Sequence, residues 1–204
     1  MSARVKICGV TRPEDARTAV SLGADMIGLN FYPRSRRFVD AATARAVAEA
    51  IPDPVWRVGV FVNASRAEIE ERRDAVGLTA IQLHGDEPPE LVRDWPCPVI
   101  RALRLRGPDD VARMLAGAEP DFVLCEGRAG GGYGGAGETF DWTWASAVPS
   151  DRLIVAGGLE PGNVGAAVRG LRPFAVDVAS GVESSPGIKD ATKMRELIHN
   201  AKSA

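Results

Sequence analysis

The chain has 204 residues, of which 45% are hydrophobic and 25% are charged, and its formal net charge is -2. This length and apolar content suit one hydrophobic core, so we expect a single domain spanning residues 1–204. The nearly balanced charge gives no general attraction for nucleic acid. No window approaches the ~18 uninterrupted apolar residues of a membrane helix. The sequence therefore predicts neither a nucleic-acid nor a membrane partner.

The number and spacing of the cysteines indicate the cellular compartment of the protein. Cys8, Cys97 and Cys125 are too few and too spread out for a disulfide framework, and their spacing does not match a zinc site. No signal peptide is visible at the start of the chain. We therefore expect a cytoplasmic protein without a metal, since free cysteines are typical of a reducing compartment.

Short apolar runs alternate with amphipathic stretches along the chain. The runs are rich in β-branched residues, as expected of parallel strands that are buried on both faces. They occupy residues 5–8, 26–30, 58–62, 80–83, 99–103, 122–125, 153–156 and 174–178. Predicted helices occupy residues 13–22, 41–51, 64–75, 88–95, 108–115, 162–168 and 191–201, with a weaker pattern at 140–148.

Eight strands at about 25 residues per unit predict the α/β class and a single (β/α)8 TIM barrel. A doubly wound open sheet is the alternative. Its glycine fingerprint is missing after the first strand, where Cys8 is followed by Gly9, Val10 and Thr11. One segment interrupts the alternation. The glycine-rich residues 127–137 follow the sixth strand, and we expect them to form a mobile loop.

Cys8 ends the first predicted strand. Reacting groups in this barrel come from the carboxyl ends of the strands. A thiolate at that place can remove a proton from carbon, but an ordinary thiol has a pKa near ~8.5 and needs a neighbouring cation. Lys6 lies two residues back and faces the same way. Taken alone, Cys8 is more simply interpreted as a small buried hydrophobe.

Basic side chains follow the second strand. Arg34, Arg36 and Arg37 stand beside Ser35, and arginine binds a carboxylate or a phosphate through two parallel hydrogen bonds. A solvated basic loop is the simpler interpretation. His84 ends the fourth strand, where an acid–base role and a structural role are equally compatible with the sequence.

Glycines follow the last two strands, at Gly157-Gly158 and at Ser180-Gly181. Glycine lets backbone N–H groups approach a phosphate, and these two loops are the usual phosphate site of the barrel. Together they form the strongest purely physical signal in the sequence. Glu126 ends the sixth strand. A carboxyl in a closing apolar site can act as a general acid, although a solvated loop carboxylate is the simpler alternative.

Longer motifs resemble the phosphoribosylanthranilate isomerase family of tryptophan biosynthesis. They cover essentially the whole chain in order, at residues 6–11, 30–37, 58–63, 82–85, 134–142, 156–159, 172–183, 186–187 and 189–190. The resemblance implies an Amadori rearrangement of N-(5-phosphoribosyl)anthranilate to 1-(2-carboxyphenylamino)-1-deoxyribulose 5-phosphate. It implies no cofactor, because the substrate nitrogen serves as the electron sink.

The resemblance also implies roles for individual residues. It makes Cys8 the base, Glu126 the general acid and Arg37 the partner of the anthranilate carboxylate. The ribose phosphate is expected on backbone N–H groups, and two further polar groups support the site. The expected phosphate residues are Gly157, Gly158, Ser180 and Gly181, and the supporting residues are Asp177 and His84.

Two departures from the family pattern keep alternatives open. The family has an aspartate at Glu126 and a lysine at Glu138. One alternative is therefore a diverged paralogue that binds a phosphosugar with weak or no turnover. Another is a broad-specificity isomerase that also acts on aminoaldoses of the histidine pathway. That chemistry pairs two aspartates, one of them at the end of the first strand, and Cys8 at that position argues against it. The sequence leaves a monomer and a homodimer equally open.

Overall fold

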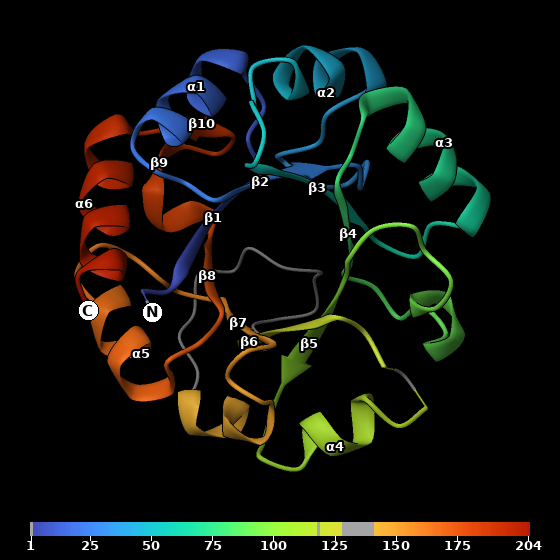
Figure 1. Cartoon of the computed structure of the whole chain (residues 1–204), viewed down its shortest axis with the longest axis vertical. Helices are drawn as coiled ribbons and strands as arrows, with labels where there is room; N and C mark the ends of the chain where they lie inside the picture. Colours follow the sequence, from blue (N-terminus) through green and yellow to red (C-terminus); the bar gives the residue numbers. More distant parts are fainter. Residues whose placement is uncertain (1, 118, 128–140) are drawn as a thin grey trace.

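The computed structural model describes residues 2–117, 119–127 and 141–204. Eight strands form a closed barrel in which each strand pairs with the next along the chain and β8 pairs with β1. All of these pairs are parallel. The helices form an outer ring around the barrel (Figure 1). The predicted TIM barrel is thereby confirmed.

The strands agree with the apolar runs to within a few residues. The barrel strands are β1 Arg4–Cys8, β2 Met26–Asn30, β3 Trp56–Phe61, β4 Ala80–Leu83, β5 Val99–Leu105, β6 Phe122–Gly127, β7 Leu153–Val155 and β8 Ala175–Val178. The α-helices are α1 Pro13–Ser21, α2 Ala41–Ala48, α3 Arg66–Val76, α4 Asp110–Met114, α5 Val164–Leu171 and α6 Ala191–Lys202.

Local sequence signals explain where the better-formed helices begin. Ser65 caps α3, and its side chain and that of Glu68 form the predicted capping box. Gly77, in the left-handed conformation, ends the same helix. Pro13 occupies the first turn of α1, where a missing N–H costs nothing. Asp190 caps α6 by accepting hydrogen bonds from Thr192 and Lys193.

Three predicted helices differ from the structure. Residues 88–95 contain the 3₁₀ turn η1 Pro89–Val92, and residues 140–148 contain the 3₁₀ turn η2 Trp142–Ala147. Consecutive prolines remove N–H donors from the first segment, and aromatic and β-branched residues weaken the second. The predicted helix at 108–115 is the short α4. Residues 128–137 of the expected mobile loop, and Glu138, lie outside the described residues.

A small hairpin was not predicted. After β8 the chain forms the 3₁₀ turn η3 Ser180–Val182 and then the antiparallel strands β9 Glu183–Ser185 and β10 Ile188–Lys189. These strands are short and largely polar, so they lack the apolar run by which the barrel strands are found. The hairpin lies beside the carboxyl end of β1 (Figure 1).

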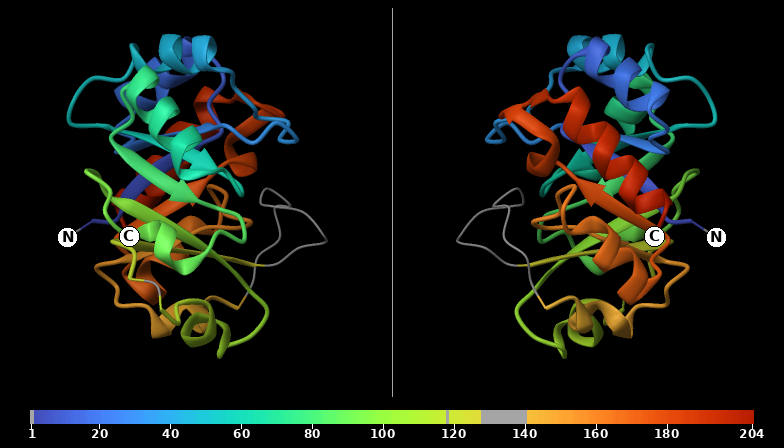
Figure 2. Two further views of the ribbon diagram at one scale, coloured as in Figure 1. Left: turned by 90° about the vertical axis from the view of Figure 1, so that its right-hand side faces the viewer. Right: turned by 90° about the vertical axis from the view of Figure 1, so that its left-hand side faces the viewer.

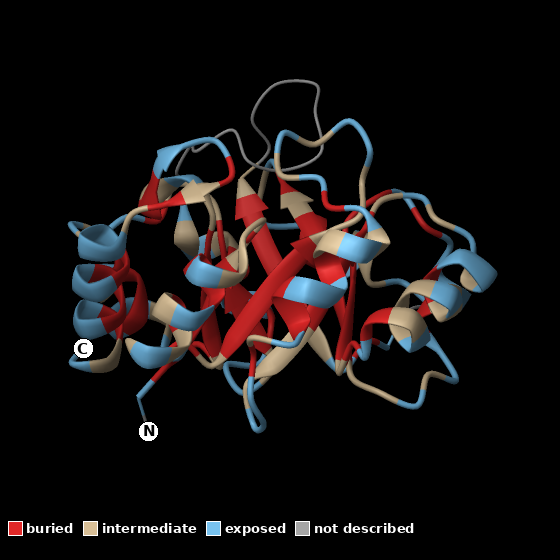
Figure 3. Cartoon of the chain, turned by 90° about the horizontal axis from the view of Figure 1, so that it is seen from above, coloured by how far each residue is buried: buried red, intermediate tan, exposed pale blue. Residues whose placement is uncertain are grey.

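Alternation along the strands separates two apolar layers. One layer fills the barrel and includes Met26, Val58 and Ala80, whereas Ile27 and Ile81 face the helices. The barrel strands are buried along most of their length (Figure 3). This packing leaves the ends of the barrel as the places where polar groups can gather.

Aromatic rings fill the end where the strands begin. Phe122 stacks on Phe174 at 4.3 Å between ring centroids, and Trp56 packs edge-on against Phe122. The Arg4 guanidinium lies 4.8 Å from the Phe174 ring centroid. Both ends of the chain lie on this side of the molecule (Figure 2). No helix in the described part of the chain is long and apolar enough to span a membrane.

Candidate active site

The inward-facing positions change from apolar to polar toward the carboxyl ends of the strands. On β4, the position that follows the buried Ala80 on the same face is Gln82. Counting in the same way places Lys6 and Cys8 on the inner face of β1, and Asp177 on that of β8. The sequence thus fills the lower barrel with apolar groups and lines its open end with groups that can carry protons.

Lys6 and Asp177 form a buried ion pair between neighbouring strands. They are paired in the β1–β8 register, and Lys6 Nζ lies 2.9 Å from Asp177 Oδ1. Both side chains are almost fully buried. Burial works to lower the pKa of Lys6, but Asp177 and Cys8 outweigh it and the net direction is upward. Lys6 therefore stays cationic beside the Cys8 sulfur.

Cys8 is partly exposed at this end of β1. Burial raises the pKa of its thiol, while Lys6 and, further away, Lys189 act in the opposite direction and Asp177 adds to the rise. Cys125 differs, because it is fully buried and burial raises its pKa to about 12 without an opposing cation. Cys8 is accordingly a thiol that a ligand can reach and that has cations to stabilise its thiolate.

His84 and Glu126 form a second polar pair at the same end of the barrel. His84 Nε2 lies 2.8 Å from Glu126 Oε1, and the Gln82 amide lies 2.8 Å from Nδ1. With the Gln82 amide N–H on Nδ1, the neutral ring carries its proton on Nε2 and donates it to the carboxylate. Burial lowers the pKa of His84, but Glu126 outweighs it and the pKa is raised overall. Asp177 and Lys6 also affect this pKa, so the two pairs face each other.

Of the three predicted arginines, one turns toward the site. Arg34 and Arg36 are exposed, whereas Arg37 is only 14% exposed and binds Glu183 through both Nε and Nη2, each at 2.7 Å. Its methylene groups lie against Gly9, where a Cβ would be 2.3 Å from Arg37 Cδ. Gly9 also has a φ of +69°, which favours glycine. Gly9 therefore makes room for Arg37 beside Cys8.

The two predicted glycine turns are in contact. Gly157 and Gly158 follow β7 with φ values of +84° and +63°. At Gly181, after β8, a Cβ would be 1.9 Å from the backbone oxygen of Leu159. Both turns are at least partly exposed. This is the close approach of two loops that a phosphate cradle requires.

Three charged residues near the site were not predicted from the sequence, namely Glu87, Glu183 and Lys189. Glu183 and Lys189 lie in the hairpin and contact Arg37 and Cys8. Glu87 accepts hydrogen bonds from Arg101 and from the backbone of Gly85, and so fixes the loop after His84. These contacts join segments that are far apart in sequence. The sequence shows these charges next to the glycines and strand ends that were already selected. It does not show which charged residues pair with one another.

His, Cys, Asp and Glu side chains are common metal ligands in proteins. Within residues 2–117, 119–127 and 141–204, no group of three or more such side chains is placed to hold a metal ion. Opposite charges of the site instead lie next to one another, as between Lys6 and Asp177. The arrangement therefore provides proton donors, proton acceptors and anion-binding groups.

Gly28 is the neighbour of Cys8 on β2, and it gives a testable prediction. A Cβ at Gly28 would lie 2.9 Å from Cys8 Sγ and 3.1 Å from Lys6 Nζ, so Gly28→Ala must displace the sulfur. A misplacement of ~1 Å can lower a rate by on the order of 100-fold. We expect such a fall in kcat/KM, measured by steady-state kinetics, with a cooperative thermal transition retained.

The matched control is Gly170→Ala in α5. A Cβ there meets nothing within 4 Å, so activity should be unchanged and helix stability slightly increased. Equal kinetics for Gly28→Ala and the wild type would contradict the placement of the sulfur.

Comparison with known proteins finds similarity over nearly the whole chain. The family described as N-(5'phosphoribosyl)anthranilate (PRA) isomerase matches residues 5–200. N-(5'-phosphoribosyl)anthranilate isomerase of Myxococcus xanthus is 51% identical, covering 100% of this chain and 98% of its own length. The Pseudomonas fluorescens protein of the same name is 48% identical over 97% of this chain and 95% of its own.

Solved structures give the same result. Phosphoribosyl anthranilate isomerase from Thermotoga maritima has a TM-score of 0.90 and 43% identity, over 99% of this chain and 100% of its own. A phosphoribosyl anthranilate isomerase in complex with reduced 1-(o-carboxyphenylamino)-1-deoxyribulose 5-phosphate has a TM-score of 0.87 and 41% identity, with the same coverage. Matches of this extent favour the isomerase over a diverged, binding-only relative. The chain belongs to the N-(5'-phosphoribosyl)anthranilate isomerase family.

Proposed function

We propose that this chain isomerises N-(5'-phosphoribosyl)anthranilate with Cys8 as the base and Glu126 as the acid. One observation carries the assignment of roles. A partly exposed thiol beside the Lys6–Asp177 ion pair shares one end of the barrel with the His84–Glu126 pair and the two glycine turns. A proton acceptor, a proton donor and an anion cradle are thus available to one ligand. We place this reaction in the tryptophan pathway.

In the first step the His84–Glu126 pair supplies a proton. When protonated, the pair holds one transferable proton between the Glu126 carboxyl group and the His84 ring, and Glu126 raises the pKa of His84. Glu126 transfers it to the ribose ring oxygen as the bond from that oxygen to C1 breaks. The electron pair of the substrate nitrogen forms the double bond to C1, which gives an open-chain Schiff base. Glu126 is then a carboxylate paired with His84.

In the second step the Cys8 thiolate removes the proton from ribose C2. The C–H electrons form a C1–C2 double bond and the C1–N electrons return to nitrogen, so an enolamine results without an external oxidant. Tautomerisation of the enolamine gives the amino-ketose. Lys6 stabilises the thiolate, because its ammonium is within hydrogen-bonding reach of the sulfur.

Two anionic groups orient the substrate. The phosphate is held by backbone N–H groups of the turns at Gly157, Gly158, Ser180 and Gly181, which carry no side chain larger than that of serine. The anthranilate carboxylate is bound by Arg37, whose planar guanidinium matches it in shape and charge. Anchoring both ends of the substrate fixes C2 over the sulfur, and such positioning accounts for part of the rate enhancement.

The remaining proposals concern context. We assign residues 1–204 to one catalytic domain that acts in the cytoplasm on a small phosphosugar, as a monomer or a homodimer. The Thermotoga maritima enzyme is described as dimeric, with monomers generated from it, which supports both states. The proposed site needs no residue from a second subunit, because every residue named in it belongs to this chain.

Substitution of Glu126 tests the acid. Glu126→Gln removes the transferable proton. A general acid typically accelerates a reaction by ~100- to 10,000-fold, so we expect kcat to fall by that factor in steady-state kinetics. Glu126→Asp withdraws the carboxyl by one methylene group from its 2.8 Å contact with His84, and it should lower kcat on the order of 100-fold.

The control is Glu49→Gln at the exposed end of α2, which should have wild-type kinetics. A faster Glu126→Asp variant would mean that glutamate is poorly placed at this position. Wild-type kinetics for Glu126→Gln would remove Glu126 from the mechanism.

A further inference from the structure

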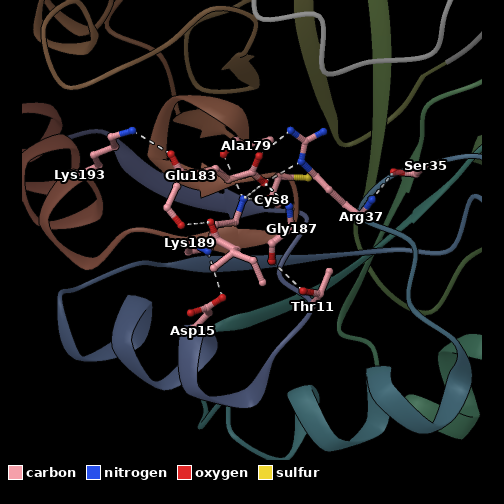
Figure 4. Close-up of polar contacts among 12 residues, drawn as sticks. Cys8, Thr11, Asp15, Ser35, Arg37, Ala179, Glu183, Gly187, Lys189 and Lys193 are labelled. Atoms are coloured by element: carbon pink, nitrogen blue, oxygen red, sulfur yellow. Dashed lines mark hydrogen bonds and ion pairs between the residues drawn. The ribbon is translucent and has the colours of Figure 1, made fainter.

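A second group of buried charges lies next to the proposed site and is not used by the reaction steps. It consists of Arg37, Glu183 and Lys189, which we call the charged clamp (Figure 4). Glu183 is 5% exposed and Lys189 is fully buried. Glu183 accepts hydrogen bonds from Arg37 Nε and Nη2 at 2.7 Å and from Lys189 Nζ at 2.9 Å. One carboxylate therefore holds two cations.

The clamp reaches the backbone of both proposed binding elements. Lys189 Nζ donates to the Cys8 carbonyl at 2.6 Å and to the Ala179 carbonyl at 3.0 Å, in addition to Glu183. Its three N–H donors are thereby all used. Cys8 ends β1, and Ala179 directly precedes the turn at Ser180. The ammonium thus ties the strand end that carries the thiol to the turn proposed for the phosphate.

The hairpin that carries the clamp is itself fixed. Thr11 donates from its hydroxyl to the Gly187 carbonyl at 2.7 Å, and Lys193 Nζ donates to the Glu183 carbonyl at 2.8 Å. The backbone N–H of Lys189 donates to Asp15 at 3.1 Å. Contacts from α1, α6 and the loop after β1 therefore converge on the hairpin, so its charged side chains have defined positions.

Burying these charges costs solvation free energy, so we look for a function that explains them. A buried ion pair rarely stabilises a fold more than apolar residues of the same volume do. The clamp also holds two cations against one anion, so one positive charge is in excess beside Cys8. The Arg37 nitrogen Nη1 has no hydrogen-bond partner among the described residues. An anionic ligand group is what would complete this arrangement.

We propose that Glu183 and Lys189 are positioning residues for the isomerisation: Glu183 orients the Arg37 guanidinium toward the ring carboxylate of the substrate, and Lys189 fixes Cys8 relative to the phosphate turn. The inference rests on the proposed function, because it assigns the substrate carboxylate to Arg37. Burial lowers the pKa of Lys189, and Glu183 and Cys8 offset only part of that effect. Burial raises the pKa of Glu183, but Arg37 and Lys189 outweigh it and the net direction is downward, so the carboxylate stays ionised.

Binding of two ligands to Glu183→Gln separates positioning from a merely structural role. The first is reduced 1-(o-carboxyphenylamino)-1-deoxyribulose 5-phosphate, and the second is the same compound without the ring carboxylate. An ionic hydrogen bond to a misoriented guanidinium is lost, so calorimetry should give about tenfold or more weaker binding of the first ligand. The second ligand should bind as it does to the wild type. Equal losses for both ligands would overturn the inference.

Kinetics on Lys189→Met provide the second readout. The groups that face Cys8 are Lys6 and Asp177 from the barrel, Lys189 from β10 and Arg37 from the loop after β2. Removal of Lys189 leaves the thiolate with one cation fewer, so the rising limb of kcat/KM against pH should move to higher pH. An unchanged limb would contradict the role of Lys189.

Controls keep the outcome interpretable. Glu196→Gln on the exposed face of α6 should match the wild type in both assays. If Glu183→Gln unfolds, Glu183→Asp retains the charge but withdraws the carboxylate, and it should show the same selective loss. The wild type is measured first. Absent turnover of phosphoribosylanthranilate would refute the proposed function, whereas turnover with no selective loss in the variants would refute the clamp alone.

Discussion

Cys8→Ala should lower kcat by about 100- to 10,000-fold, which is the range that a positioned general base contributes. KM should change little, because the thiol acts on the reacting carbon and not on the phosphate or the carboxylate. Cys8→Ser should be similarly inactive, since a hydroxyl is far less acidic than a thiol and forms no useful anion near neutral pH. The decay of substrate fluorescence measures both variants.

Cys97→Ser is the matched control, because Cys97 is also partly exposed but lies far from the site in sequence, before β5. It should retain the wild-type rate. Full activity in Cys8→Ala would mean that another group takes the proton.

The pH dependence of the wild type follows from the same residue. Burial raises the pKa of Cys8, and a base must be deprotonated to act, so activity is gained as the pH rises. The rising limb of kcat/KM in the free enzyme should therefore lie above the ordinary thiol pKa of ~8.5. A limb centred well below that value would belong to another group.

Lys6→Met should lower the free energy of unfolding by about 3–5 kcal/mol, the cost of leaving one partner of a buried ion pair uncompensated. Lys6 is fully buried and Asp177 is 8% exposed, so water cannot replace the ammonium. The pKa of Lys6 is raised in the fold, so the wild type keeps this contribution below about 10.4 and loses it above. Urea unfolding at neutral pH measures the change.

Lys202→Met provides the comparison for this experiment. Its ion pair with Asp25 is about one third exposed on both sides, and exposed pairs contribute about 0–1 kcal/mol. A loss for Lys6→Met no larger than that for Lys202→Met would contradict the buried pair. The double variant Lys6→Met, Asp177→Leu should recover part of the stability, because it removes the uncompensated charge.

The barrel itself was predictable because its strands are buried on both faces. Runs such as 26–30 and 80–83 are largely apolar, and the structure places β2 and β4 at those residues. Alternation then places Lys6 and Cys8 on one face without further information. The turns at 157–158 and 180–181 were found because their glycines follow the last two strands.

Other features depend on contacts that no local pattern reveals. Arg37 and Glu183 are separated by 146 positions, and the sequence presents Arg37 as one of three equivalent arginines. The hairpin that carries Glu183 is short and polar, so nothing marks it as structured. The helices expected at 88–95 and, from a weaker pattern, at 140–148 were wrong. Consecutive prolines remove N–H donors from the first segment, and aromatic and β-branched residues disfavour a helix in the second.

Turnover of N-(5'-phosphoribosyl)anthranilate by the purified wild-type chain tests the central claim most directly. The assay follows loss of substrate fluorescence in the presence of a metal chelator, with Cys8→Ala in parallel. We predict rapid loss with the wild type and almost none with the variant. Binding of the reduced product analogue without any loss of fluorescence would contradict the account and identify a phosphosugar-binding protein that does not catalyse the rearrangement.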